Sequence, residues 1–404
     1  MNTIKIGVLR EGKVPPDKRV PFTPVQCKEI MDQFSNVELV VQPSPIRCFE
    51  DEQYKALGVS MKEDLTDCDV LIGVKEVPVN DLIQDKTYLY FSHTHKLQPY
   101  NRKLIQTMID KNIRMVDYEC LTFPKGGRVL GFGRFAGLVG AYNGFIAYGN
   151  KYKTYSIKAA HECEDMKEML GELSKVKLPN IKIVLTGSGR VAGGSLEILE
   201  ALNLRKVQVN EFLNETFDEP VYCHIDVADY NKHKDGLAFD KKHFYKNGAE
   251  YLSDFERFTK VSDMFIAGHF WDNKSPAFFT KEQAQSPDFK IKVIADVSCD
   301  IACAIPSTLR PSTIAEPVYD YDPVTGLEAA AYGKDTITVM AVDNLPCELP
   351  KDASEDFGRH MIDHILPQFF NNDQHGILKN ASLCMEGALT QKYQYMQDFV
   401  AEKV

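Results

Sequence analysis

The chain has 404 residues, which predicts two or three domains, with two favoured. Apolar residues make up 44% and charged residues 26%, which is typical of a soluble globular protein and excludes a disordered, collagen-like or small disulfide-stapled chain. The 47 basic and 57 acidic side chains sum to a net charge of −10, which argues against nucleic acid or an anionic membrane as the partner. An anionic small substrate remains compatible with this charge, because cations in a cleft can override the global field.

The cysteines and the N-terminus indicate where the protein resides. The ten cysteines are scattered without any C-x-x-C pair, so we expect reduced thiols in a cytoplasmic protein. The N-terminal sequence MNTIKIGVLREGK has no apolar h-region and no cleavage site, and it predicts no signal peptide. The most apolar stretch, residues 131–149, contains Arg134, Asn143 and six glycines, so we do not expect a membrane span.

The first 120 residues alternate between short apolar runs and helical patterns. Thr23 followed by Pro24 predicts a helix start, and residues 99–111 predict another helix. Strands of this length alternating with helices predict a parallel α/β sheet. The predicted strands are residues 3–9, 37–43, 69–75, 87–93 and 114–119.

The remainder of the chain predicts a second α/β unit. Small residues at 137, 140 and 144 predict a buried helix that crosses from one domain to the next, and residues 164–176 predict an exposed helix. Residues 214–250 have weak periodicity and predict an irregular insertion. The tail predicts a strand at 337–346 followed by an amphipathic helix. Further strands are predicted at residues 181–186, 205–212, 263–270 and 292–298.

The most specific motif is the glycine-rich run Gly187, Ser188, Gly189, Arg190, Val191, Ala192. It follows an apolar strand and opens a helix, which is the context that a G-x-G-x-x-A nucleotide-binding motif requires. Gly187 permits a tight turn, Gly189 lets the backbone approach a pyrophosphate, and Ala192 or Gly193 lets the helix pack closely. The N–H groups at the helix N-terminus then bind phosphate. The alternative is a tight turn without a ligand.

The strand predicted at 205–212 bears on the choice of cofactor. An acidic residue at its end binds the adenosine ribose of NAD, and the absence of one admits NADP. The candidates are Asn210 and Glu211, and the strand register determines which of them faces the ribose. We therefore expect NAD or NADP as the cofactor.

Polar side chains follow successive strands of the first unit, at the sheet edge where α/β proteins bind their ligands. Lysine, histidine and glutamate there supply acid–base groups, and arginines bind carboxylates bidentately. Each such side chain alone is more often simply solvated, so the inference depends on their recurrence. The candidates are Arg19, Lys75, His93, Lys96, Glu119 and Arg128.

Histidine spacing does not predict a metal site. His93 and His95 share a face only while the strand continues, and the pair His360 and His364 lacks the glutamate of the zincin motif because Met361 stands in its place. We expect no metal.

Taken together, these motifs resemble the saccharopine dehydrogenases of the lysine-forming type. They resemble still more closely the lysine–ketoglutarate reductase module of bifunctional lysine-degrading enzymes. The resemblance runs in order from about residue 4 to residue 360 and extends to alanine dehydrogenases and transhydrogenase subunits. The segments that carry it are REGK, DKRVPFTP, LIGVKEVP, FSHTHKLQPYNRKL, VDYE, GFGRFAGLVG, LTGSGRVAGG, IADVSCDI and AVDNLPCELPKDAS.

The resemblance implies an α/β fold with two Rossmann-like domains, parallel sheets and an active-site cleft between them. It implies that Lys75 and His93 form the acid–base pair and that Glu119 tunes them. It also implies that Asp296 lines the cofactor cleft. The residues implied to bind substrate are Arg19, Arg128 and Lys96.

The resemblance also implies a domain layout and a reaction. We expect a substrate domain of residues 1–138 plus 318–404 and an NAD(P)-binding Rossmann domain of residues 139–317. The implied reaction is the NAD(P)-dependent interconversion of saccharopine with lysine and 2-oxoglutarate, so the partners are small molecules, an amino acid and a 2-oxo acid. An alanine dehydrogenase-like enzyme and a non-catalytic nucleotide-binding relative are the alternatives. The segment FWDNKSPAF replaces the P-G-A-K-A-P loop of alanine dehydrogenases, which disfavours the first of these.

Overall fold

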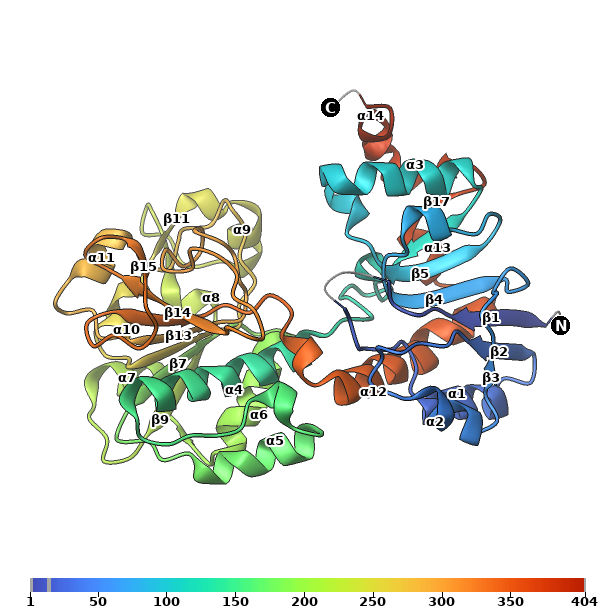
Figure 1. Cartoon of the computed structure of the whole chain (residues 1–404). Coiled ribbons are helices and arrows are strands. Elements are labelled where there is room, and N and C mark those ends of the chain that lie inside the picture. Colours follow the sequence, from blue (N-terminus) through green and yellow to red (C-terminus); the bar gives the residue numbers. More distant parts are fainter. Residues whose placement is uncertain (1–2, 13–15, 403–404) are drawn as a thin grey trace. The chain divides into compact units, whose positions relative to one another are not determined.

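The computed structural model describes residues 3–12 and 16–402, and the chain divides into two compact units (Figure 1). Unit 1 comprises Met1–Phe132 and Pro350–Val404, and unit 2 comprises Gly133–Leu349. Each unit contains an eight-stranded sheet in which most neighbouring strands are parallel. The predicted α/β class is confirmed.

The sheet of unit 1 has the strand order β18-β17-β6-β5-β4-β1-β2-β3. Its six N-terminal strands are parallel. Of the two strands from the C-terminal tail, β17 pairs antiparallel with β6 and β18 pairs antiparallel with β17. Their bounds are β1 Ile4–Val8, β2 Val37–Val41, β3 Ser60–Met61, β4 Val70–Lys75, β5 Thr87–Phe91, β6 Arg114–Asp117, β17 Ser382–Met385 and β18 Ala388–Leu389. The helices of unit 1 are α1 Pro24–Gln33, α2 Asp51–Ala56, α3 Arg102–Asp110, α12 Pro350–His360, α13 Ile377–Ala381 and α14 Gln397–Val400.

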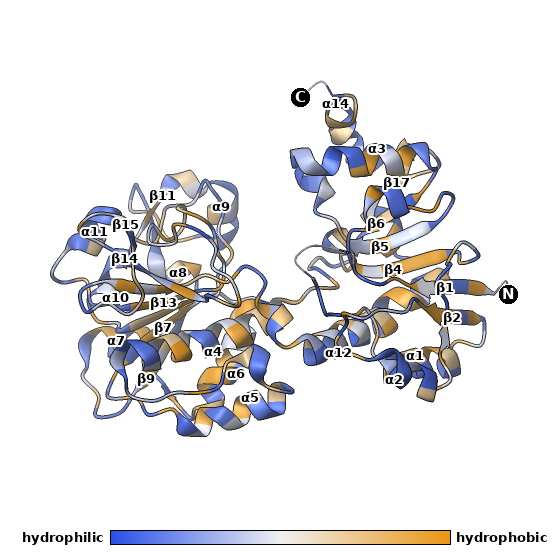
Figure 2. Ribbon diagram, viewed as in Figure 1, coloured by the Kyte–Doolittle hydropathy of each residue, from blue (hydrophilic) through white to orange (hydrophobic). Residues whose placement is uncertain are grey.

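The local sequence explains these elements. Strand β4 is buried along its first five residues and is hydrophobic through most of its length (Figure 2), as a strand with helices on both faces requires. Helix α1 begins where predicted, because the Thr23 hydroxyl accepts the Gln26 N–H at 3.2 Å and the Gln26 side chain accepts the Thr23 N–H at 3.0 Å. This reciprocal pair is a capping box.

The sheet of unit 2 has the strand order β15-β14-β16-β13-β12-β7-β9-β8, with an antiparallel edge at β14 and β15. A separate two-stranded ribbon joins β10 to β11. The strands are β7 Lys182–Thr186, β8 Arg205–Lys206, β9 Val221–Ile225, β10 Asn231–His233, β11 Tyr251–Ser253, β12 Met264–Ala267, β13 Val293–Asp296, β14 Val318–Asp322, β15 Leu327–Ala329 and β16 Ile337–Met340. The helices are α4 Gly133–Tyr152, α5 Met166–Glu172, α6 Arg190–Ala201, α7 Val209–Asn214, α8 Val227–Tyr230, α9 Lys241–Lys246, α10 Glu256–Thr259 and α11 Lys281–Gln285.

Helix α4 carries the small-residue stripe and lies entirely in unit 2. A Cβ atom on Gly137 would lie 1.7 Å from the carbonyl oxygen of Val191, and one on Gly144 would lie 2.8 Å from the Cβ of Ala295. The stripe therefore lets α4 pack directly against α6 and the sheet. Among the described residues, no helix is long and apolar enough to span a membrane, α4 included.

The position at which the tail leaves unit 2 differs from the expectation. Residues 318–349 were expected with the N-terminal domain, but β14 and β16 belong to the second sheet. All four residues of β16 are buried, and the strand pairs in parallel with β13. Its mostly apolar sequence suits an internal strand of either sheet, so the sequence pattern did not discriminate between them.

Candidate functional site

Three candidate residues lie at the carboxyl ends of neighbouring strands in unit 1. Lys75 is the last residue of β4, His93 follows β5 by two residues, and Glu119 follows β6 by two residues. Strands β4, β5 and β6 are adjacent and parallel, so these ends share one edge of the sheet. The sequence-based expectation that these residues cluster agrees with this placement.

Glu119 is the centre of the cluster. Its Oε2 lies 2.8 Å from Nδ1 of His93, and its Oε1 lies 3.0 Å from both the Lys96 ammonium and the Arg128 guanidinium. Burial alone would raise the pKa of Glu119, but hydrogen bonds from His93 and Lys96 hold it well below its usual value. An ionised Glu119 requires a proton on Nδ1 of His93, which leaves Nε2 as the nitrogen that can exchange a proton.

His93 has a left-handed backbone conformation, with φ of 58°. Such a conformation costs a β-carbon residue on the order of 1 kcal/mol and persists where the surroundings enforce it, often at functional sites. The imidazole stacks on the Phe91 ring with centroids 6.3 Å apart, and the Lys75 ammonium lies 5.9 Å from the same ring. Phe91 therefore contacts both members of the expected acid–base pair.

Two acidic residues near Lys75 were not identified from the sequence. Glu11 accepts the backbone N–H groups of Val74 and Lys75 at 2.6 and 2.9 Å, and burial raises its pKa to about 8. Asp17 binds Arg19 through Nε at 3.0 Å and through Nη2 at 2.6 Å. Both lie within or beside the REGK and DKRV segments, whose charged residues were the available signal.

Arg19 is 5% exposed, and its guanidinium lies 4.1 Å from the centroid of the Phe132 ring. Its pairing with Asp17 means that a substrate carboxylate would have to share the guanidinium. Arg128 and Lys96 are about half exposed, and both contact Glu119. His95 lies next to them, where Asp117 and, after it, Cys120 raise its pKa to about 9.

The glycine-rich turn of unit 2 connects β7 to α6. Gly187 has φ of 106°, and a Cβ there would lie 2.3 Å from the carbonyl oxygen of Gly268, so glycine is required. Residues 188–190 are exposed at the N-terminus of the 12-residue helix α6, whose first turn includes the half-buried Val191. Of the two residues expected to allow close packing, Ala192 is buried whereas Gly193 faces open space. Gly194 also packs closely, against the backbone of α4.

The two residues expected at the end of the strand after the glycine-rich turn lie elsewhere. Asn210 and Glu211 lie on helix α7 instead of at the end of a strand, and Glu211 accepts the Gln208 N–H as a helix cap. The strand beside β7 is β9, within the segment that we expected to be irregular, and Asp226 follows it directly. Burial opposes ionisation of Asp226, but hydrogen bonds from Lys241 and the Val227 N–H hold its pKa below the usual value.

Aromatic side chains line a cavity of about 330 Å³. Val227, the residue after Asp226, is part of its wall. Its walls include Val227, Tyr230, Phe244, Trp271 and Phe278. The residues come from the ends of β9 and β12 and from the 214–250 segment. Neither Asp226 nor this cavity was predicted from the sequence, because residues 221–225 were not predicted to form a strand.

Asp296 is the last residue of β13. Its carboxylate is fully buried and accepts the hydroxyls of Ser298 and Thr308, both at 2.6 Å, and the N–H of Cys299 at 3.0 Å. These donors occupy both carboxylate oxygens. Asp296 therefore organises the loop after β13.

Arg134 lies in the GFGRFAGLVG segment. Its guanidinium binds both carboxylate oxygens of Glu197 on α6, each at 2.7 Å. An intramolecular ion pair thus accounts for this residue.

Comparisons with known proteins address the resemblance directly. Residues 7–139 match the family model described as alanine dehydrogenase/PNT, N-terminal domain. The chain is 27% identical to the alpha-aminoadipic semialdehyde synthase of Arabidopsis thaliana over 97% of its own length, and 24% identical to the saccharopine dehydrogenase (NAD(+), L-lysine-forming) of Emericella nidulans over 91%. The predicted resemblance is confirmed.

The coverage of these relatives differs. The chain spans only 41% of the Arabidopsis protein but 92% of the Emericella protein. A solved L-alanine dehydrogenase superposes with a TM-score of 0.66 at 16% identity, covering 98% of this chain and 100% of that one. At this identity the superposition supports the fold alone.

Proposed function

We propose that this chain is a nicotinamide-dependent oxidoreductase that interconverts saccharopine with lysine and 2-oxoglutarate. The observation that carries the proposal is the arrangement in unit 1, where Glu119 holds His93 at 2.8 Å and Phe91 contacts both His93 and Lys75. The similarity to a lysine-forming saccharopine dehydrogenase along nearly its whole length supports the same reaction.

The residues of unit 2 fit a dinucleotide. The turn at Gly187 and the exposed N-terminus of α6 suit a pyrophosphate, Asp226 suits a ribose, and the adjoining aromatic cavity suits an adenine ring. When bound, such a cofactor supplies or accepts the hydride. The part of the protein that we assign to it is binding and orientation.

The residues of unit 1 suit the proton transfers of the reaction. The ε-amine of lysine must lose a proton before it attacks the 2-oxo carbon, and we assign that proton to Lys75. Attack turns the carbonyl oxygen into an alkoxide, which becomes a hydroxyl by taking the proton that the amine nitrogen releases. The hydroxyl then takes a proton from Nε2 of His93 and leaves as water, giving the protonated imine that accepts hydride. Glu119 acts as a positioning residue because it fixes Nδ1 of the same ring.

The substrate class also accounts for the cations. Saccharopine carries three carboxylates, and cations near the acid–base pair would bind them. We assign this role to Arg19, Arg128 and Lys96. Arg19 pairs with Asp17, and Arg128 and Lys96 contact Glu119, so these acidic side chains orient the cations. A substrate carboxylate would bind the same cations alongside Asp17 or Glu119.

Substitution of the acid–base pair tests this function. We expect Lys75→Met and His93→Gln to lower kcat by 10²-fold or more, on the order of the contribution of general acid–base catalysis, with little change in cofactor affinity. The assay follows NAD(P)H absorbance with lysine and 2-oxoglutarate. Matched controls are Lys103→Met and His375→Gln, which replace exposed residues of the same types in unit 1. Unchanged turnover in both active-site variants would refute the assignment.

We further propose that the enzyme prefers NAD to NADP, because an ionised Asp226 would accept the ribose hydroxyls and repel a 2′-phosphate. Asp226→Ser should reduce the ratio of kcat/KM for NADH over NADPH by about 10-fold or more, on the order of one charge interaction. Glu211→Gln, a change at the position expected from the sequence, serves as the control and should leave the ratio unchanged. A wild-type enzyme that prefers NADPH would contradict this proposal.

A further inference from the structure

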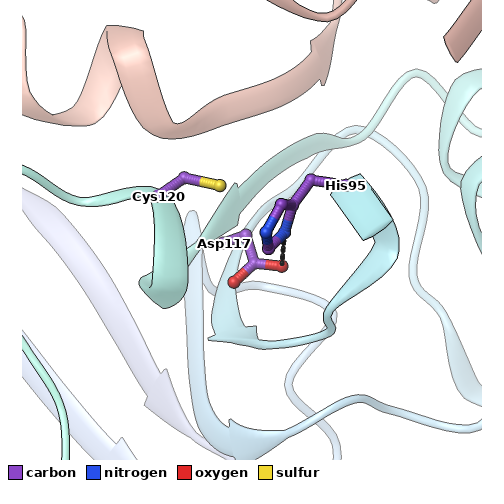
Figure 3. Close-up of side chains that lie close together, drawn as sticks. All are labelled: His95, Asp117 and Cys120. Atoms are coloured by element: carbon purple, nitrogen blue, oxygen red, sulfur yellow. Dashed lines mark ion pairs between the residues drawn. The ribbon is translucent and has the colours of Figure 1, made fainter. Parts of the chain in front are cut away.

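A mixed cluster of nitrogen, oxygen and sulfur ligands lies beside the residues already described. His95 comes from the short turn Thr94–Lys96, Asp117 ends β6, and Cys120 ends the turn Tyr118–Cys120. One ring nitrogen of His95, one carboxylate oxygen of Asp117 and the sulfur of Cys120 all lie within 4.8 Å of one another. Figure 3 shows the His95 imidazole beside the Asp117 carboxylate, with the sulfur of Cys120 pointing toward them.

The imidazole is oriented as a metal ligand is. Its Nε2 lies 3.6 Å from Oε2 of Glu119, so the carboxylate attracts the proton of that nitrogen. Its Nδ1 is buried and has no hydrogen-bond partner among the described residues, and Oδ2 of Asp117 lies 3.9 Å away. A metal-bound histidine typically offers one nitrogen to the ion and donates the other N–H to a carboxylate. His95 matches the first part of that pattern, and the Glu119 carboxylate lies within ion-pair distance of its other nitrogen.

The second ligand is held in place by its own contacts. Asp117 is fully buried, and its Oδ2 accepts the Ser92 hydroxyl at 2.6 Å and the Ser92 N–H at 3.4 Å, while its Oδ1 accepts the Glu119 N–H at 2.8 Å. Oδ1, which accepts a single hydrogen bond, retains a lone pair for a cation. Hydrogen bonds to the ligating carboxylate are themselves a feature of protein metal sites.

We propose that His95, Asp117 and Cys120 form a binding site for a divalent transition metal ion, with Zn²⁺ as the best match. Zinc accepts nitrogen, oxygen and thiolate ligands together, and three protein ligands leave a fourth position for water. Binding displaces the Cys120 thiol proton and the Nδ1 proton of His95, and it places the ion between Nδ1 and the carboxylate. Histidine spacing in the sequence predicted no metal, because the three ligands of this cluster come from two separate parts of the chain.

A second group of similar composition in unit 2 lacks these features. His233, His243 and Glu250 also approach one another, but Nδ1 of His233 accepts the N–H of Asp235 at 3.2 Å. That contact places the proton of a neutral His233 on Nε2, which lies 3.6 Å from Glu250. In that tautomer the Nδ1 lone pair is already engaged and Nε2 carries a proton, so neither ring nitrogen of His233 offers a lone pair to a metal.

The test uses the full chain, reduced and stripped of metal, and titrates it with Co²⁺ as a spectroscopic probe and with Zn²⁺ as the competitor. We expect one ion per chain and a thiolate-to-cobalt charge-transfer band that Zn²⁺ abolishes. Cys120→Ser should remove the band, and His95→Asn should weaken binding by at least about tenfold, as loss of a ligand or its support does. The control Cys303→Ser replaces an exposed cysteine of unit 2 and should leave both unchanged.

A second measurement needs no variant to fold. Zn²⁺ should slow alkylation of Cys120 by iodoacetamide at least about tenfold, as read from peptide masses, while the rate at Cys303 stays the same. Co²⁺ binding without a thiolate band, a band that survives Cys120→Ser, or unaltered alkylation of Cys120 in Zn²⁺ would overturn the proposal. Binding that His243→Asn abolishes and Cys120→Ser does not would assign the ion to unit 2 instead.

Discussion

Replacing Gly194 by alanine should destabilise unit 2, whereas the same replacement at Gly193 should not. The two residues are adjacent on α6, so they share helix and chain context, but Gly193 is exposed and Gly194 is buried. A Cβ on Gly194 would lie 1.9 Å from the carbonyl oxygen of Arg134 and 2.8 Å from the backbone nitrogen of Leu138, both on α4. A Cβ on Gly193 would meet nothing within 4 Å. The pair therefore separates helix packing from helix propensity.

The magnitude follows from the geometry. An ordinary contact of a Cβ is at least 3.4 Å, so α4 and α6 would have to separate by about 1.5 Å. Overpacking typically costs about 1–3 kcal/mol, and because the obstacle is backbone we expect a loss of about 3 kcal/mol. Gly193→Ala should instead gain up to about 1 kcal/mol, since alanine favours a helix over glycine.

Hydrogen exchange under native conditions provides the assay, because a chain of two units need not unfold in one step. We expect amides of α4 and α6 to lose protection in Gly194→Ala and to retain it in Gly193→Ala. Amides of β4 in unit 1 serve as the internal reference. Equal protection in the two variants would refute the reasoning that this glycine is required by helix contact.

Two other substitutions test charges in unit 1. Glu119→Gln should lower kcat about 10²-fold and shift the pH profile of kcat, because the neutral amide no longer holds the Nδ1 proton of His93; an identical pH profile would contradict the positioning role. Glu11 has a folded pKa of about 8, above the usual 4.5, so between these pH values the folded chain keeps a proton that the unfolded chain loses. The free energy of unfolding should therefore fall as the pH rises from about 4.5 to about 8, by at most about 1.4 kcal/mol per pH unit. Glu11→Gln should flatten that slope in denaturation curves measured between pH 5 and pH 8, whereas a slope equal to that of the wild type would show that other groups cause it.

Much of the architecture was predictable because its strands are long enough and apolar enough to be recognised. The capping box at Thr23 and the glycine-rich turn at Gly187 depend only on residues near in the chain, and both were located correctly. Strand β9 was missed because its five residues, VYCHI, include a histidine and lie between polar segments. Conversely, residues 205–212 alternate like a strand, yet a helix cap at Gln208 ends β8 after two residues.

The candidate site was likewise predictable where it depends on strands that the sequence pattern reveals. The ends of β4, β5 and β6 were predictable, so the proximity of Lys75, His93 and Glu119 could be inferred from parallel topology. The partners of these residues were not predictable, because the contact of Glu11 with the Lys75 backbone joins residues 64 positions apart. The donors of Asp296 were equally unpredictable, because the loop that follows its strand supplies them.

Turnover of purified protein with two substrate pairs tests the central claim most directly. NADH or NADPH is mixed with lysine and 2-oxoglutarate in one cuvette and with ammonia and pyruvate in another, and the loss of absorbance of the reduced cofactor is followed. Consumption with lysine and 2-oxoglutarate, with saccharopine identified as the product by mass, is the expected result. Consumption with ammonia and pyruvate alone would assign the chain to alanine dehydrogenase-like chemistry, and consumption with neither pair would contradict the proposed reaction.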